Sequence, residues 1–316
     1  MFLEIVLLLV GFFILIKGAD IFVDGASNLA RNFKMSKMLI GLTIVAFGTS
    51  APEFAVSIKS MLSSQGEIVL GNVIGSNILN ILLILGVSAL VHPLHVKNNT
   101  VKKELPIVLM LTTLLIVLMS DHIFDIHMLN RVTRNDGIVL LLFFCVFLYY
   151  LVAMMRRKTE ENTDESYWSL KKSLLFTGLG IGAIIVGSNM VVNSATFLAE
   201  AFGVSERIIG LTIIAFGTSL PELVTSVVAT RKGEYDIAIG NVVGSNIFNI
   251  GIVLGLPIAL LGSVSVGSFS ILDLLFFFLS AFCLFVFSCN DYKITKKEGF
   301  FFLFLFVCYY GGILLF

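Results

Sequence analysis

The most prominent pattern in the chain is a series of long apolar stretches separated by short polar segments. Ten such stretches can be drawn, each close to the ~20 residues that a helix needs to cross a bilayer. We therefore expect an all-α polytopic membrane protein with ten transmembrane helices. The expected helices cover residues 2–30, 38–62, 67–91, 104–120, 137–155, 170–199, 207–230, 236–261, 269–288 and 299–316. The first and sixth exceed one bilayer thickness, so we expect them to tilt or to extend beyond it.

Composition supports this class of protein. The chain is 57% hydrophobic and 13% charged, with a mean hydropathy of +1.00, whereas soluble domains carry about 25% charged residues. This composition cannot cover a water-facing surface, so the lipid bilayer is the expected partner. The formal net charge is zero, which gives no reason to expect nucleic acid as a partner, and no obligate protein partner is evident. The first apolar stretch has no basic segment before it and is too long for a signal peptide.

Lysine and arginine are distributed unevenly between the two sets of loops. If the N-terminus is outside, 16 of the 21 basic residues fall in inside loops, 3 in outside loops and 2 within apolar stretches. This is a strong positive-inside pattern. We therefore expect both termini outside and a cytoplasmic linker at about residues 156–169.

Two parts of the chain repeat one pattern. Residues 41–86 and 210–255 align without a gap at an offset of 169, and 24 of their 46 positions are identical. Five expected helices separate equivalent points, and an odd number reverses the direction of the chain. We therefore expect two inverted five-helix repeats, residues 1–155 and 170–316. Transporters of this architecture bind their substrate at the repeat interface near the membrane midplane.

The first polar motif of each copy lies inside an apolar stretch. It reads GTSAPE at residues 48–53 and GTSLPE at residues 217–222. Proline removes a backbone donor and crowds the preceding turn, so we expect helical hydrogen bonding to be disturbed there. We expect the carbonyls of Ala46 and Ala215, one turn before the serines, to be free to face a cation. Such backbone is tolerated at membrane depth only inside protein or along a cavity.

Glu53 and Glu222 end these motifs and are the principal candidates for function. An ionised carboxylate in hydrocarbon costs at least ~2.5 kcal/mol, and no lysine or arginine in the same motifs can pair with either. A bound cation is the expected compensating charge. The alternative is a pair of protonated carboxyls with a structural role.

The second polar motif of each copy adds more oxygen atoms. It reads GNVIGSNILN at residues 71–80 and GNVVGSNIFN at residues 240–249. Spacings of four residues place a hydroxyl and an amide, or a hydroxyl and a carboxylate, on one helix face. These pairs are Ser76 with Asn80, Ser245 with Asn249, Thr49 with Glu53, and Thr218 with Glu222. A set of oxygen ligands without His or Cys suits hard cations such as Na⁺ and Ca²⁺.

The remaining residues of the second motif have a structural interpretation. Gly71 and Gly75 form a small-xxx-small face, as do Gly240 and Gly244, and we expect close helix packing there. The other asparagines are expected to bond helix to helix or to cap a break rather than to bind the ion. They are Asn72, Asn77, Asn241 and Asn246.

Together the motifs resemble the two alpha-repeats of the sodium/calcium exchanger branch of the calcium/cation antiporter superfamily. The resemblance covers both motifs in order and nearly the whole chain. It implies that the first and sixth helices form a mobile pair over the other eight. It also implies twelve ion ligands: Ala46, Thr49, Ser50, Glu53, Ser76 and Asn80, with Ala215, Thr218, Ser219, Glu222, Ser245 and Asn249.

One position departs from the family pattern. Many prokaryotic and potassium-dependent relatives carry Asp where this chain has Asn249, so this site has two carboxylates rather than three. The departure weakens the case for potassium co-transport and leaves calcium plausible, because two carboxylates neutralise one divalent ion.

The resulting hypothesis is a secondary antiporter that exchanges Ca²⁺ for Na⁺ by alternating access, with these ions as its cargo and no cofactor. Ca²⁺/H⁺ exchange is the alternative within the family. A cation channel is a further alternative, although channels usually present a ring of ligands from an oligomer. The chain has no HExxH, nucleophile or phosphate-loop motif, so we do not expect an enzyme.

Overall fold

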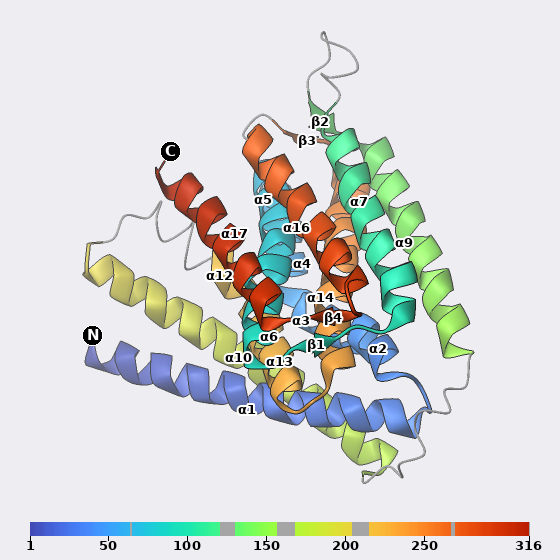
Figure 1. Cartoon of the computed structure of the whole chain (residues 1–316). Coiled ribbons are helices and arrows are strands. Elements are labelled where there is room, and N and C mark those ends of the chain that lie inside the picture. Colours follow the sequence, from blue (N-terminus) through green and yellow to red (C-terminus); the bar gives the residue numbers. More distant parts are fainter. Residues whose placement is uncertain (64, 121–129, 157–167, 204–214, 267–268, 316) are drawn as a thin grey trace.

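The computed structural model describes residues 1–63, 65–120, 130–156, 168–203, 215–266 and 269–315, and these are almost entirely helical (Figure 1). In the first half the elements are α1 (Phe2–Asn32), α2 (Lys37–Ile40), η1 (Gly41–Val45), α3 (Ala46–Thr49), α4 (Ala51–Leu62), α5 (Gly66–Leu79), η2 (Asn80–Leu85), α6 (Gly86–Val91), β1 (Leu94–His95), η3 (Thr100–Glu104), α7 (Leu105–Leu118), β2 (Arg131–Val132) and α9 (Arg134–Met155). In the second half they are α10 (Leu170–Ala201), α12 (Ala215–Thr218), α13 (Leu220–Arg231), α14 (Tyr235–Phe248), η5 (Asn249–Leu254), α15 (Gly255–Leu261), β3 (Val264–Ser265), α16 (Ile271–Cys289), β4 (Lys293–Ile294) and α17 (Lys296–Leu315). Elements written η are π-helical turns.

Each expected apolar stretch is mostly helical where the structure describes it. Within the described residues, six helices are long and apolar enough to cross a membrane, and a bent pair, Lys37–Thr49 with Ala51–Leu62, makes a seventh if it is one span. The beginning of the seventh expected stretch, 207–214, and most of the expected linker, 157–167, lie outside the described residues. The structure is thus that of an integral multi-pass membrane protein.

The structure also has a small amount of β-structure, which the apolar pattern did not predict. Two short antiparallel strand pairs join loops that are distant in sequence: β1 with β4, and β2 with β3. Each strand has only two residues, too few for an alternating pattern to reveal them. The two pairs lie at opposite ends of the helical bundle (Figure 1).

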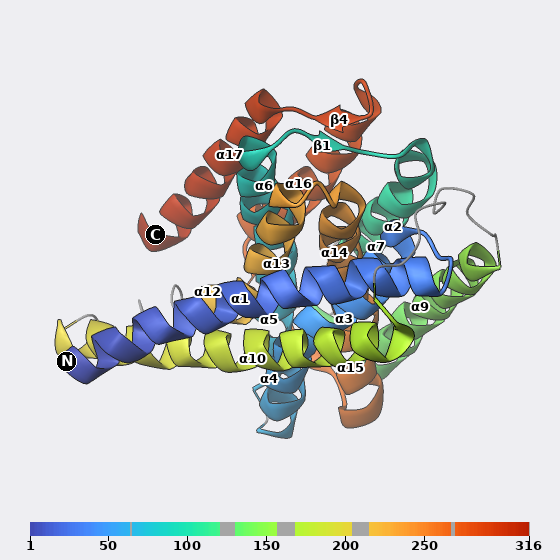
Figure 2. The ribbon, with the colours of Figure 1, turned by 90° about the horizontal axis from the view of Figure 1, so that it is seen from below.

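The two longest helices form a layer of their own. α1 and α10 lie side by side and cross the remaining helices (Figure 2). Small residues allow this close packing: a Cβ on Gly18 would lie 2.8 Å from Ala183 Cβ, and one on Gly187 would lie 2.6 Å from Leu15 N. Because these contacts bring the backbones together, α1 and α10 pack as a unit.

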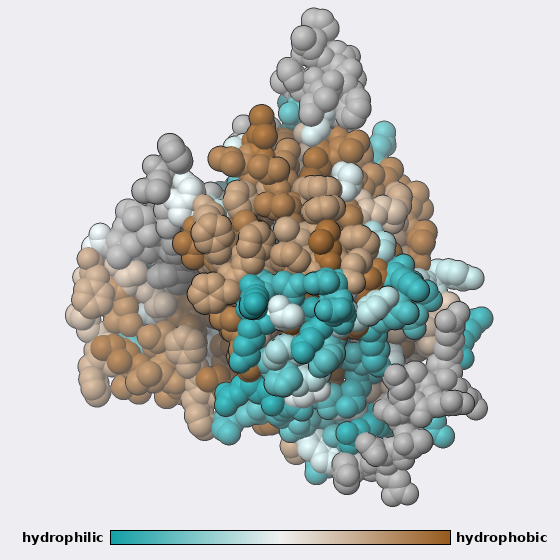
Figure 3. Space-filling model, in the orientation of Figure 1, coloured by the Kyte–Doolittle hydropathy of each residue, from teal (hydrophilic) through white to brown (hydrophobic). Residues whose placement is uncertain are grey.

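The core is divided in the same way. A large apolar cluster fills the bundle of helices beneath this layer, for example Ile78, Leu111 and Ile247. A smaller cluster, including Phe22 and Ile184, joins the α1–α10 layer to the bundle. The outer surface seen in Figure 3 is largely apolar, with a hydrophilic region towards one end. That distribution suits a molecule surrounded by lipid.

Candidate ion-binding site

The site begins with two breaks in helices. Ser50 separates α3 from α4, where the axis bends by 46°, and Ser219 separates α12 from α13. The prolines lie in the first turn of the following helix, where their missing N–H costs little. Glu53 and Glu222 lie in the same first turns. A helix N-terminus stabilises a carboxylate, so each break creates favourable surroundings for one buried charge.

The serines at the breaks connect the two motifs. Ser50 Oγ donates to Glu222 Oε1 at 2.9 Å, and Ser219 Oγ donates to Glu53 Oε1 at 3.2 Å. Thr49 and Thr218 also lie near the glutamate of the opposite motif. Each glutamate is therefore held by hydroxyls from the other copy, and both have only 1% of their surface exposed.

The second motif closes the same centre. Ser245 Oγ lies 3.0 Å from Ser50 Oγ, and Ser76 Oγ lies 3.4 Å from Ser219 Oγ. Asn80 and Asn249 are buried and begin the π-helical turns η2 and η5. Such turns are rare and occur often at functional sites.

Four buried oxygen atoms at this centre have no hydrogen-bond partner among the described residues. They are Glu53 Oε2, Glu222 Oε2, Asn80 Oδ1 and Asn249 Oδ1. None of the ion pairs formed within the described chain involves either glutamate. Buried polar atoms are normally paired, and buried carboxylates without a cation are costly. These four oxygens are free to coordinate a hard cation.

The Ala46 carbonyl is not free of helical bonding, contrary to the expectation. It accepts the Ser50 N–H at 3.0 Å and the Thr49 hydroxyl at 3.3 Å, so it is not released from helical bonding. The carbonyl that a proline deprives of its donor is the one four residues earlier, which for Pro52 is Gly48. Ala215 is the first residue of α12.

Ser188 of α10 has a role that sequence reasoning missed. Pro221 leaves the Gly217 carbonyl without a helical donor, and Ser188 Oγ donates to that carbonyl at 3.0 Å. Ser188 is buried. The available signal was a polar residue within an apolar stretch, at the position corresponding to Ala19 of α1.

The structural asparagines bond between helices, as expected. Asn72 donates to the Glu53 carbonyl, and Asn241 donates to Ser226 Oγ. The close packing expected at Gly240 and Gly244 is also present, because a Cβ at either would lie within 3.0 Å of η1 or its neighbours. By the offset of the repeat, the segment that would match this packing partner for Gly71 and Gly75 is 207–214, which lies outside the described residues.

Comparison with known proteins agrees with this class of molecule. The family model described as "sodium/calcium exchanger protein" matches residues 3–153 and 172–315. The matched family is one of membrane cation antiporters and not a family of enzymes. The chain belongs to the sodium/calcium exchanger family, which confirms the resemblance noted in the motifs.

Relatives cover most of the chain. The inner membrane protein YrbG of Escherichia coli is 43% identical over 267 residues, covering 81% of this chain and 80% of its own. The putative antiporter CaxA of Alkalimonas amylolytica is 38% identical and covers 81% and 80%. The sodium/calcium exchanger MaX1 of Methanosarcina acetivorans is 37% identical and covers 79% and 81%. A solved structure of the sodium-calcium exchanger NCX_Mj superposes with a TM-score of 0.84 at 32% identity, over 97% of both chains.

Proposed function

We propose that this chain exchanges Ca²⁺ for Na⁺ across a membrane by alternating access. The observation that carries the proposal is the set of four unpartnered oxygens contributed equally by the two motifs. Two carboxylates balance one divalent ion, and hydroxyl and amide oxygens can replace the water around Na⁺ or Ca²⁺. Two relatives support the choice of ions, since MaX1 and NCX_Mj are named as sodium/calcium exchangers.

The architecture we propose has ten transmembrane helices in two inverted repeats, 1–155 and 170–316, joined by a cytoplasmic linker at 156–169. Cross-bonding of the serines and glutamates in matched pairs supports the repeat. The position of the two strand pairs at opposite ends supports the inversion (Figure 1). In this arrangement α1 and α10 move together over the bundle, and both termini lie outside the inner membrane of a prokaryotic cell.

The proposed ligands are the twelve residues that the family resemblance implies. Glu53 and Glu222 contribute charge, and Asn80 and Asn249 contribute amide oxygens. The hydroxyls of Ser50, Ser219 and their neighbours are close enough to turn from the carboxylates to an ion. The full set is Ala46, Thr49, Ser50, Glu53, Ser76, Asn80, Ala215, Thr218, Ser219, Glu222, Ser245 and Asn249.

Uptake of ⁴⁵Ca²⁺ by proteoliposomes tests the counter-ion. We expect Na⁺-loaded vesicles to accumulate calcium, with uptake unchanged when the pH gradient is collapsed. Calcium uptake driven by a proton gradient in the absence of sodium would instead establish Ca²⁺/H⁺ exchange. Uptake that needs no internal counter-ion, with the membrane voltage clamped, would indicate a channel. Vesicles without protein and vesicles with Glu53→Gln are the controls.

A further inference from the structure

Two asparagines that are not among the proposed ligands form a symmetric pair beneath the site. Asn77 Nδ2 donates to the main-chain carbonyl of Asn246 at 3.2 Å, and Asn246 Nδ2 donates to the main-chain carbonyl of Asn77 at 3.4 Å. Both residues have 1% of their surface exposed. A main-chain carbonyl only accepts hydrogen bonds. Each amide must therefore direct its NH₂ group to the opposite chain segment, which fixes the position of its own Oδ1.

Those fixed oxygens act on the next pair of amides. Asn80 Nδ2 donates to Asn246 Oδ1 at 3.0 Å, and Asn249 Nδ2 donates to Asn77 Oδ1 at 3.0 Å. The NH₂ group of each outer amide is thereby occupied, and its oxygen is the atom left without a partner among the described residues. On each side, a chain of hydrogen bonds runs from a main-chain carbonyl through two amides to an oxygen that has no partner among the described residues.

We propose that Asn77 and Asn246 are positioning residues that select the cation-binding orientation of Asn249 and Asn80, each acting on the opposite repeat. An Asn side chain can present either an oxygen or an NH₂ group, and only the oxygen binds a cation. Without its anchor, Asn80 or Asn249 is free to rotate and to present a donor to the ion. The inference rests on the proposed function, because it assigns a role within the same site.

A double-mutant cycle tests this coupling. Loss of a residue that orients a metal ligand typically weakens affinity by 10–100-fold, so we expect Asn246→Ala to weaken Ca²⁺ and Na⁺ binding by at least about tenfold. In a protein that already carries Asn80→Ala, adding Asn246→Ala should change binding by less than about threefold, because the ligand it orients is absent. Binding of each ion is measured separately in detergent, beside thermal unfolding without ions.

Asn72→Ala is the matched control. Asn72 is also an asparagine of α5, and its amide bonds to α4 at Glu53 O and Ser57 Oγ. These bonds do not involve Asn80, so the effect of Asn72→Ala should add to that of Asn80→Ala. The Asn77 and Asn249 pair provides an independent second cycle if Asn246→Ala does not fold.

A carboxylate at position 80 gives a test with the opposite sign. The Asn80→Asp substitution would set an acceptor against Asn246 Oδ1, so Asn246→Ala should improve binding in the Asn80→Asp protein although it impairs binding in the original chain. A purely structural role of Asn246 predicts impairment in both. Additive effects of Asn246→Ala and Asn80→Ala, in a protein that binds either ion, would overturn the positioning role alone. Failure of the unmodified protein to bind Ca²⁺ or Na⁺ would overturn the proposed function as well.

Discussion

The two repeats contribute equivalent hydrogen bonds at the centre of the molecule, but their loops between the first and second polar motifs differ. At the centre, the bonds come in equivalent pairs: Ser50 to Glu222 matches Ser219 to Glu53, and Asn80 to Asn246 matches Asn249 to Asn77. Every polar residue in these bonds has an identical counterpart 169 positions away. The two copies thus contribute the same chemistry to the site.

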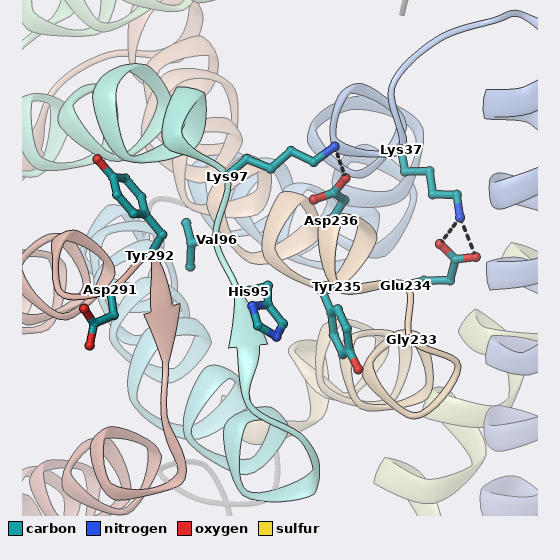
Figure 4. Close-up of a pocket in the computed structure, with 10 residues that line it drawn as sticks. All are labelled: Lys37, His95, Val96, Lys97, Gly233, Glu234, Tyr235, Asp236, Asp291 and Tyr292. Atoms are coloured by element: carbon teal, nitrogen blue, oxygen red, sulfur yellow. Dashed lines mark hydrogen bonds and ion pairs between the residues drawn. The ribbon is translucent and has the colours of Figure 1, made fainter. Parts of the chain in front are cut away.

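The loop between α13 and α14 carries charged residues that the matching loop of the first copy lacks. Lys232 Nζ lies 2.7 Å from Asp24 Oδ1 of α1, and Glu234 accepts a bond from Ser27 of α1 and pairs with Lys37. Figure 4 shows the Lys37–Glu234 pair on the wall of a pocket, beside the Lys97–Asp236 pair. The corresponding loop positions in the first copy are uncharged, namely Ser63 and Gln65.

The helices that these loops face differ in the same way. Asp20 and Asp24 of α1 correspond to Asn189 and Asn193 of α10. The contacts of Lys232 and Glu234 therefore bind α1 to the bundle through charges that belong to the second copy. In the proposed alternating-access cycle, one site meets the same ions from both sides of the membrane, and in this chain the two halves of that site carry the same types of ligand. The two end states need not have equal free energies, so the contacts that stabilise them are free to differ.

The largest expected effect tests the equality of the centre. Glu53→Gln and Glu222→Gln should each abolish calcium transport, because each removes one of the two charges that balance the ion. Breaking a buried charge pair costs about 3 kcal/mol or more, which corresponds to roughly a hundredfold loss of affinity. Calcium binding and ⁴⁵Ca²⁺ exchange by the two variants should be reduced to a similar extent.

Glu104→Gln is the matched control for a buried glutamate. Glu104 is fully buried at the end of η3 and bonds to Tyr150, which is not a candidate ligand. Its replacement should leave calcium affinity within about threefold of the original. Near-normal transport by either central variant would show that its glutamate is structural, and a large difference between the two would break the equivalence of the copies.

Much of this arrangement could be predicted from the sequence. Apolar stretches of spanning length identify helices because every backbone group in lipid must be bonded within its own segment. Glu53 and Glu222 could be singled out because a charge in such a stretch needs compensation. The repeat at a constant offset relates the two motifs position by position.

Other features depend on contacts that sequence spacing does not encode. The Gly217 carbonyl accepts a hydrogen bond from Ser188, which lies 29 residues earlier on another helix. Orientation of the Asn80 amide depends on Asn246, 166 residues away. The Ala46 carbonyl keeps its helical bond because the carbonyl that loses its donor lies four residues before Pro52, at Gly48.

A smaller effect concerns the hydroxyl of Ser188 in α10, because the matching residue of α1 is Ala19 and has no hydroxyl. Ser188→Ala removes the donor to the Gly217 carbonyl and leaves a buried acceptor unpaired, which costs about 1–3 kcal/mol. Thermal or denaturant unfolding in detergent should show this loss. Unchanged stability of Ser188→Ala would contradict this account.

The smallest expected effect concerns the charged contacts of α1. Lys232→Ala removes the contacts with Asp24 and with the Asp20 carbonyl, both at 2.7 Å. Because the Lys232 and Asp24 side chains are 27% and 48% exposed, their pairing contributes only about 0.2–1 kcal/mol. A bias of this size shifts a balance between two end states by up to roughly fivefold without preventing transport. We expect calcium exchange to continue at an altered rate, with a difference from the original protein that shrinks at high salt.

Lys17→Ala separates this bias from a general loss of positive charge near α1. Lys17 pairs with Asp20 at 3.8 Å within the same helix, so its contact stays intact wherever α1 moves and favours neither end state. The Lys232 contact joins α1 to the bundle and must break if α1 slides over it. Lys232→Ala should therefore alter the exchange rate while Lys17→Ala does not, and both should leave equilibrium calcium affinity within about twofold. If the two variants change the rate equally, the charged loop of the second copy has no part in setting the balance, and its difference from the first copy carries no functional meaning.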